Sequence, residues 1–118
     1  MLAVSSDGEF NYHDNNSSDI KRIAYQYSGS LTNWSHIVLT RSISDAKLFI
    51  EGSLKTNESF TNTHFNIAQN GLWIGGDQDS VGGGWSTKQQ LNGLLDDVRI
   101  YDRALSAAEV QALYNLGQ

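Results

Sequence analysis

The sequence contains no cysteine and no proline, and both absences limit what the chain can be. Without cysteine there is no disulfide framework, no thiol nucleophile and no zinc–thiolate site. Without proline, the turns must be built from Gly, Asn, Asp and Ser, which are abundant in this chain. The absence of cysteine leaves the compartment of the protein open.

Positive charge is also scarce, with 8 Lys and Arg against 13 Asp and Glu and a formal net charge of −5. Proteins that bind nucleic acid need a basic face, so this composition excludes that class and is compatible with cations. No apolar run approaches the roughly 20 residues of a membrane-spanning helix, and the start, MLAVSSDGEF, is too short and uncharged for a signal peptide. We expect a cell-surface or extracellular location if the chain is part of a larger protein, and a cytoplasmic one if Met1 is the natural start.

Short β-rich runs separated by polar turns dominate the chain, whose 118 residues fit one domain, 1–118. The Asp7-Gly8 dipeptide predicts a hairpin turn, because glycine adopts positive φ without strain. Polar loops are expected at 14–19 and 28–33, and the secondary structure of residues 54–70 is ambiguous from their pattern. The predicted strands are 2–6, 9–13, 20–27, 34–41, 46–51, 72–74 and 94–103.

One helix is predicted, at the C-terminal end. Ser106 and Glu109 have the S-x-x-E spacing of a capping box, and Gly117 suits the end of the helix. Apolar residues then recur on one helical face, at Val110 and Leu113. The sum predicts an all-β fold, an antiparallel β-sandwich with one short docked helix. Its core is expected to include the aromatic residues on predicted strands, which are Trp34, Phe49 and Trp73.

Residues 75–93, GGDQDSVGGGWSTKQQLNG, have no strand or helix period and are longer than a plain connector requires. The carboxylates of Asp77 and Asp79 and the main-chain oxygen of Gln78 can point to one centre. The side-chain amide of Gln89 or Gln90 could join them if the loop folds back at the glycines 82–84. Hard oxygen donors of this kind suit Ca²⁺, and a solvated turn is the alternative interpretation.

Other motifs carry less chemistry. The loop lacks the oxygen spacing of an EF-hand and the GKS or GKT of a phosphate-binding loop. The alternating Asp, Asn and Ser of 14–19 are read as a solvated turn rather than a second ion loop. Adjacent Asp96 and Asp97 point to opposite faces of a strand, so we expect one structural acceptor and one solvent-facing group. The histidines, His13, His36 and His64, show no ligand spacing, and His36 is expected to pack at a strand.

The stretch 72–114, which begins LWIGGDQDS, resembles the C-terminal part of a pentraxin and of the related laminin G-like jelly rolls of the concanavalin A-like lectin/glucanase superfamily. Pentraxins follow a Leu-Gly strand end with Glu-Gln-Asp-Ser, a glycine pair and a later glutamine. The corresponding features here are Asp77 to Ser80, Gly82-Gly83 and Gln89. Upstream, WSHIVLTRSISDAKLFIEGSL is similar to a strand pair of those domains, and the tail DDVRIYDRALSAAEV is close to the form common in bacterial ones.

The resemblance implies a calcium site made by Asp77, Gln78, Asp79 and Gln89, with Gln78 contributing its main-chain oxygen. Asp77 stands where pentraxins have glutamate. The implied ligand is a glycan or a phosphoryl group, and Trp85 or Tyr101 would add a flat apolar contact to it.

The resemblance also shows what this chain lacks. A pentraxin Asp-Asn pair on an early strand and the first strands of a full jelly roll have no counterpart, so we expect sheet edges without partners and a homo-oligomer that covers them. Glucanases of the superfamily use a Glu-x-Asp-x-x-Glu motif that is absent, and we therefore expect a non-catalytic module. The alternative is a structural or protein-interaction module without a small-molecule ligand.

Overall fold

The computed structural model describes residues 2–16, 19–30, 32–59, 74–76, 78–80, 83–85 and 90–117. The chain divides into two compact units, one made of Met1–His64 and Tyr101–Gln118, and one made of Phe65–Ile100. The prediction of a single domain stays a prediction. The described elements are β1 (Leu2–Val4), β2 (Glu9–Asn16), β3 (Asp19–Gln26), β4 (Ile37–Arg41), β5 (Asp45–Ile50), β6 (Ser53–Ser59), β7 (Gln78–Ser80), β8 (Gly83–Trp85) and α1 (Ala107–Leu116).

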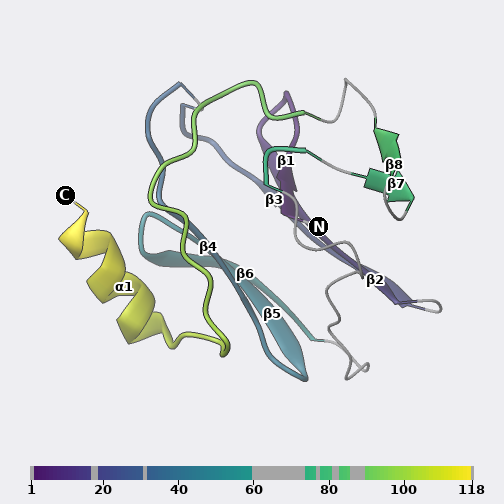
Figure 1. The fold of residues 1–118 in the computed structure, drawn as a ribbon. Helices are drawn as coiled ribbons and strands as arrows, with labels where there is room; N and C mark the ends of the chain where they lie inside the picture. The colour runs from purple at the N-terminus through teal and green to yellow at the C-terminus, as the bar shows by residue number, and fades with distance from the viewer. Residues whose placement is uncertain are drawn as a thin grey trace. The chain divides into compact units, whose positions relative to one another are not determined.

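The first unit holds two antiparallel three-stranded sheets, β1-β2-β3 and β4-β5-β6 (Figure 1). Alternate residues of one strand point to the same face of a sheet, so one face of β5 meets apolar residues of β2 and β3. The buried cluster between the sheets consists of Phe10, Tyr12, Ile23, Ala46, Leu48 and Ile50. The predicted all-β antiparallel sandwich with one C-terminal helix is confirmed.

The turn between β1 and β2 forms at the predicted Asp7-Gly8 dipeptide. Gly8 has a φ of 88°, a left-handed conformation that glycine adopts without steric cost. Two main-chain hydrogen bonds close the turn. The amide of Gly8 donates to the carbonyl of Ser5 at 2.9 Å, and the amide of Ser5 donates to the carbonyl of Glu9 at 2.9 Å. The Ser5 hydroxyl donates to the Asp7 carboxylate at 2.7 Å and lowers the pKa of that carboxyl.

The predicted polar loop at 14–19 is wrong. The β2–β3 ladder continues through its polar residues to the Asn16↔Asp19 pair, so only residues 17–18, outside the described residues, connect the strands. Polar residues occupy strand positions readily once the register is set elsewhere. The register here is set by apolar pairs nearer the sandwich core, such as Tyr12↔Ile23.

The aromatic residues expected in the core have three different outcomes. Phe49 is buried, with 1% of its surface exposed, as predicted. Trp34 is 67% exposed, so its prediction as a core residue is wrong. The reason is that β4 begins at Ile37 rather than at Trp34, and a residue before the strand need not face the core. Trp73 lies outside the described residues, and Ile74, the described residue of the predicted strand 72–74, is exposed and in no strand.

The turn between β5 and β6 contains an unusual residue. Glu51 and Gly52 have φ values of 53° and 71°, which define a tight hairpin turn of the type that favours Asn-Gly. Glutamate rarely adopts positive φ. The Glu51 carboxylate accepts a hydrogen bond from the main-chain amide of His36 at 3.0 Å, and the Glu51 amide donates to the His36 carbonyl at 2.9 Å. These bonds tie the turn to the segment that leads into β4.

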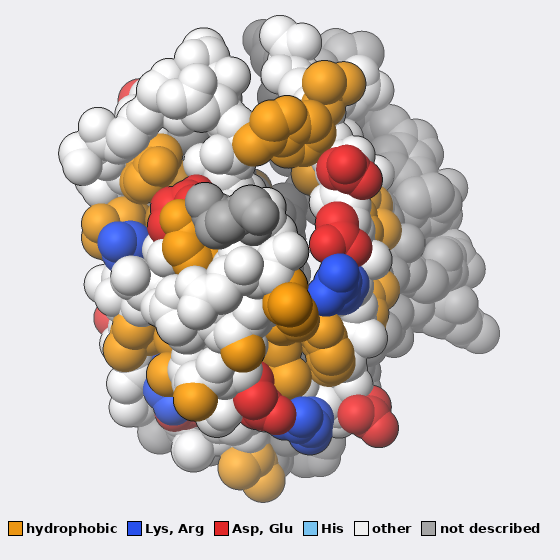
Figure 2. Space-filling view, turned by 90° about the vertical axis from the view of Figure 1, so that its left-hand side faces the viewer, with side chains coloured by type: hydrophobic (Ala, Val, Ile, Leu, Met, Phe, Trp, Pro, Cys, Tyr) orange, Lys and Arg blue, Asp and Glu red, His pale blue; other side chains and the backbone are white. Residues whose placement is uncertain are grey.

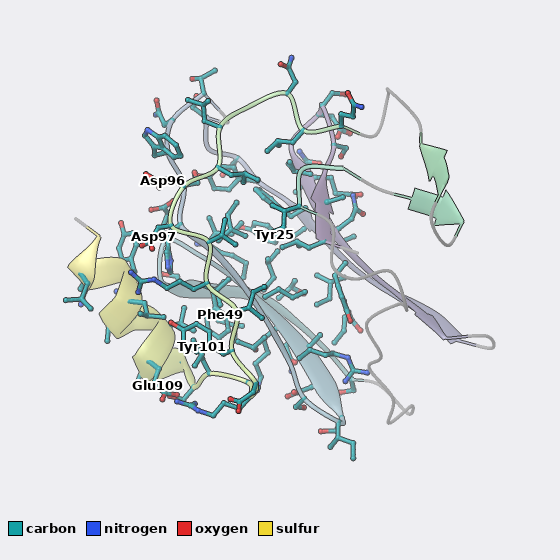
Figure 3. All side chains as sticks on the ribbon, viewed as in Figure 1. Tyr25, Phe49, Asp96, Asp97, Tyr101 and Glu109 are labelled. Atoms are coloured by element: carbon teal, nitrogen blue, oxygen red, sulfur yellow. The ribbon has the colours of Figure 1, made fainter. Side chains whose placement is uncertain are left out.

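The C-terminal helix begins and ends as predicted. Ser106 caps it, the Ser106 and Glu109 side chains form the full capping box, and Gly117 is the C-cap. Leu105 and Val110 pack with Phe49 on the face of β5 opposite the sandwich core, so Phe49 lies between the β4-β5-β6 sheet and α1 (Figure 3). Burial of this apolar face, rather than helix propensity, stabilises so short a helix.

Acid is expected to weaken the start of α1 at Glu109. Two hydrogen bonds from Arg103, at 2.6 and 3.1 Å, and further bonds from Ser106 lower the pKa of Glu109 from 4.5 to about 2. Because the folded-state pKa is depressed, this stabilisation is present above pH 4.5 and is lost as the pH falls toward 2. Far-ultraviolet circular dichroism of the wild type and of Glu109→Gln measures the effect. The difference between the two should shrink over this pH range, and a constant difference contradicts the prediction.

Candidate functional site

The second unit contains a loop whose two ends are joined. The main-chain amide of Leu91 donates to the carbonyl of Gly75 at 2.9 Å. Gly75 has a φ of 82°, a conformation that residues with a Cβ adopt only at a cost, so glycine is required at this end. The two ends of the oxygen-rich segment between Gly75 and Leu91 therefore lie next to each other.

Part of the segment 75–93 is a hairpin, which corrects the prediction that it has no strand character. Strands β7 and β8 pair antiparallel, with the registers Gln78↔Trp85 and Ser80↔Gly83. The alternation rule missed these strands because they are short and polar and have no apolar face. Of the glycines 82–84 at which a main-chain reversal was predicted, Gly83 and Gly84 belong to β8 and Gly82 lies outside the described residues.

The described residues include some of the predicted site residues. Gln78 and Asp79 lie on β7, and Trp85 lies on β8 with its main chain directly opposite Gln78. The predictions for Asp77 and Gln89 fall outside the described residues. Gln90, the other amide considered, is exposed and precedes the residue that closes the loop. Among the described residues, no group of at least three His, Asp or Glu side chains could hold a metal ion.

Tyr101 was predicted as a ligand contact. It belongs to the first unit, where 44% of its surface is exposed, and it lies on the segment that leads to α1 (Figure 3). Its exposed ring is available to a flat apolar ligand group.

The predicted strand 94–103 is wrong, since residues 90–106, all of which are described, belong to no strand. The apolar alternation is present, but a strand forms only where another strand accepts its main-chain hydrogen bonds. Asp97 instead has a φ of 52°, and its amide donates to the Asp96 carboxylate at 2.8 Å. Both carboxylates are exposed, and neither faces a core.

Sequence reasoning also missed the partner of Asp97. The Arg99 guanidinium donates two hydrogen bonds to the Asp97 carboxylate, at 3.0 and 2.8 Å. Such a fork matches the planar geometry of a carboxylate, and the Asp-x-Arg spacing was the signal that could have predicted it. The Asp97 carboxylate therefore already has a cationic partner within its own segment.

His36 packs as predicted. Its ring lies against Tyr114 of α1, with the ring centroids 5.8 Å apart, and it is half-buried. Its Nδ1 is buried and has no hydrogen-bond partner in the part of the chain that the structure describes. His13 lies on β2, and His64 is outside the described residues.

Comparisons with known proteins give the fold a family context. The model of a laminin G family, described as the concanavalin A-like lectin/glucanases superfamily, matches residues 1–111. C-reactive protein of Cavia porcellus is 30% identical over 71 residues, which are 60% of this chain and 32% of that protein. C-reactive protein of Oryctolagus cuniculus is 30% identical over 69 residues, 58% of this chain and 31% of that protein. The chain thus spans about a third of the length of these relatives.

A solved structure with the same fold is an S-layer domain-containing protein from Clostridium thermocellum ATCC 27405 (residues 221–444). The TM-score is 0.58 at 26% identity, and the match covers 96% of this chain and 54% of that one. The chain therefore spans about half the length of that protein. Among the described residues, no helix has the length and apolar character that crossing a membrane requires.

Proposed function

The chain belongs to the concanavalin A-like lectin/glucanase superfamily, and we propose that it is a non-catalytic module that binds a carbohydrate or a phosphoryl ligand through Ca²⁺. The fold and the similarity to C-reactive proteins indicate a binding module. The calcium site and its ligand are the part that we propose.

The closed loop is the observation that carries the proposal. A calcium site assembled from residues far apart in sequence needs a chain that returns to its starting point. The hydrogen bond from Leu91 to Gly75 joins the two ends of the loop. Asp77 comes two residues after Gly75, and Gln89 comes two residues before Leu91. The β7–β8 hairpin between them carries Gln78 and Asp79. The residues that would hold the ion are thus all contained in one loop with joined ends.

The donor set fits calcium chemically. Two carboxylates, a main-chain oxygen and a side-chain amide are hard ligands, and Ca²⁺ accepts 6 to 8 of them in flexible geometry. The positions that these four ligands leave open would be taken by water and by oxygens of the bound ligand. Sugar hydroxyls and phosphoryl oxygens are both hard donors, and either could complete the coordination.

Aromatic residues would add an apolar contact to the ligand. The register opposite Gln78 brings the main chain of Trp85 beside the proposed ion ligands. A sugar ring or an alkyl headgroup could lie against an indole at that place. Tyr101 belongs to the first unit, and its contact with the ligand stays a prediction.

The similarity to an S-layer domain-containing protein supports a cell-surface setting for this chain. Extracellular calcium is commonly held by weak sites in such settings, with affinities of about 10⁻⁴–10⁻³ M. We propose that this site works in that range.

Calcium is expected to raise the melting temperature relative to chelator. At about 1 mM calcium and a Kd of about 10⁻⁴–10⁻³ M, binding stabilises the folded state by about 0.4–1.4 kcal/mol. Differential scanning fluorimetry in millimolar calcium and in chelator measures the shift for the wild type and for Asp79→Ala. The shift should be present in the wild type and lost in Asp79→Ala, while Asp102→Ala, at an exposed aspartate of the other unit, keeps it. Equal melting temperatures with and without calcium in the wild type would refute the calcium site.

The second candidate is a protein-interaction module, and the exposed apolar residues of 94–100 favour it. Glycan arrays and phosphocholine resin separate the two functions. If calcium stabilises the protein but neither the array nor the resin retains the protein, the ion only stiffens the loop. The result would then favour the protein-interaction module.

A further inference from the structure

Residues 94–100, LLDDVRI, carry four exposed apolar side chains. Leu94 is 80% exposed and Ile100 is 68% exposed, and Leu95 and Val98 are also largely exposed. We call these residues the 94–100 segment. On the face drawn in Figure 2, exposed hydrophobic side chains stand among acidic and basic ones. Scattered exposed apolar residues are ordinary on a protein surface, but four within seven consecutive residues are not.

The 94–100 segment has the composition of a strand and lacks the pairing of one. Val98 and Ile100 are β-branched and two residues apart, as in a strand with one apolar face. The main chain here belongs to no sheet, although residues 90–106 are all described. A run of this composition can pair with another strand once its main chain is extended.

We propose that the 94–100 segment pairs with the same segment of a second copy of the chain, antiparallel about a two-fold axis at Val98. In that register, residues whose numbers add to 196 stand opposite each other. Val98 faces Val98 of the partner subunit, and Asp97 faces Arg99 of the partner subunit, and the symmetry repeats the second pair. A two-fold interface of this kind is closed and uses the same surface of both copies.

Charge complementarity favours this register and favours a second copy of the chain as the partner. Oppositely charged residues directly opposite each other stabilise an antiparallel pair, and like charges destabilise it. An axis at Asp97 would place two carboxylates face to face, and an axis at Arg99 would do the same with two guanidinium groups. The axis at Val98 forms two opposite-charge pairs. The sequence of the segment is thus complementary to itself.

The monomer already holds the two charges that the interface would use. Arg99 and Asp97 form a fork within one chain, with Arg99 Nη2 and Asp97 Oδ2 2.8 Å apart. Asp97 is held at positive φ, which is incompatible with a regular strand. Pairing would extend Asp97 and exchange the two intrachain ion pairs, one in each copy, for two equivalent pairs between the chains. This proposal does not depend on the calcium site.

Light scattering after size-exclusion chromatography tests the proposal through a charge exchange. The wild type should be a dimer, and Asp97→Arg and Arg99→Asp should each raise the dimer dissociation constant about tenfold or more, since each places like charges opposite each other. A 1:1 mixture of the two variants should recover the dimer, because one copy then carries two cations and the other two carboxylates. Circular dichroism checks that each variant is folded.

A second pair of variants tests the axis itself. Val98→Lys places two cations opposite each other at the centre and should give a monomer, while Ile43→Lys, at an exposed turn residue of the other unit, should leave the dimer intact. A monomeric wild type overturns the proposal. So does a dimer that survives Val98→Lys, or a mixture of the charge variants that stays monomeric.

Discussion

Replacing Phe49 with alanine is expected to lower the free energy of unfolding of the first unit by about 3–5 kcal/mol. Phe49 is the central residue of the cluster that joins α1 to β5, and it is in contact with Leu105 and Val110, which are also buried. Truncation removes the apolar contact and leaves a cavity, because a short helix fixed at its cap cannot move fully into the space. The helix would lose the burial that keeps it folded.

Chemical denaturation followed by circular dichroism measures the change, and amide hydrogen exchange locates it. The amides of α1 should lose protection first. Leu116→Ala, at a position of the same helix that is 79% exposed, removes a similar side chain and should change the stability little. A similar loss in both variants would show that Phe49 has no special role in holding the helix.

Replacing the adjacent Leu48 with alanine is expected to cost about 2–5 kcal/mol in a different part of the same unit. Successive residues of a strand point to opposite faces, so Leu48 faces β2 and β3 while Phe49 faces α1. The register shift between Leu48 and Phe49 leaves this alternation in place. Leu48→Ala therefore removes contacts with Tyr12, Ile23 and their neighbours in the sandwich core.

The two substitutions should be distinguishable by where the structure loosens. In Leu48→Ala, hydrogen exchange should rise first in β2 and β3, and the α1 amides should follow the global stability. Ile43→Ala, at an exposed residue of the β4–β5 turn, serves as the control and should be nearly neutral. Loss of protection in α1 before β2 in Leu48→Ala would mean that the two faces of β5 do not separate the clusters.

Local signals predicted the parts of the fold that are formed by neighbours in sequence. The Asp7-Gly8 turn depends on a single positive φ at Gly8, and the helix start depends on two side chains three residues apart. These interactions are complete within a few residues, and so the sequence is sufficient for them. The strand β5 was also predicted, from a short β-rich run between polar turns.

Predictions that needed a distant partner were the ones that failed. Residues 14–16 read as a loop but pair with β3, because the register is decided by apolar residues nearer the core. Residues 94–103 read as a strand but belong to no sheet of the described structure. Trp34 reads as a core residue but precedes the strand that would have carried it inward. In each case the prediction rested on residue type, and the structure differs in which main-chain segments form strands.

The features of the candidate site also separate into those that the sequence predicts and those that depend on tertiary structure. The residue types that could bind calcium, and their order between Gly75 and Gly93, are written in the sequence alone, and so are the capped helix and the sandwich fold class. The tertiary structure decided that the loop ends meet through Leu91 and Gly75, that Trp85 stands opposite Gln78, and that Asp97 is already paired with Arg99. The physical reason is that composition and local spacing act within a few residues, whereas main-chain pairing and ion pairing depend on which segments the fold brings together.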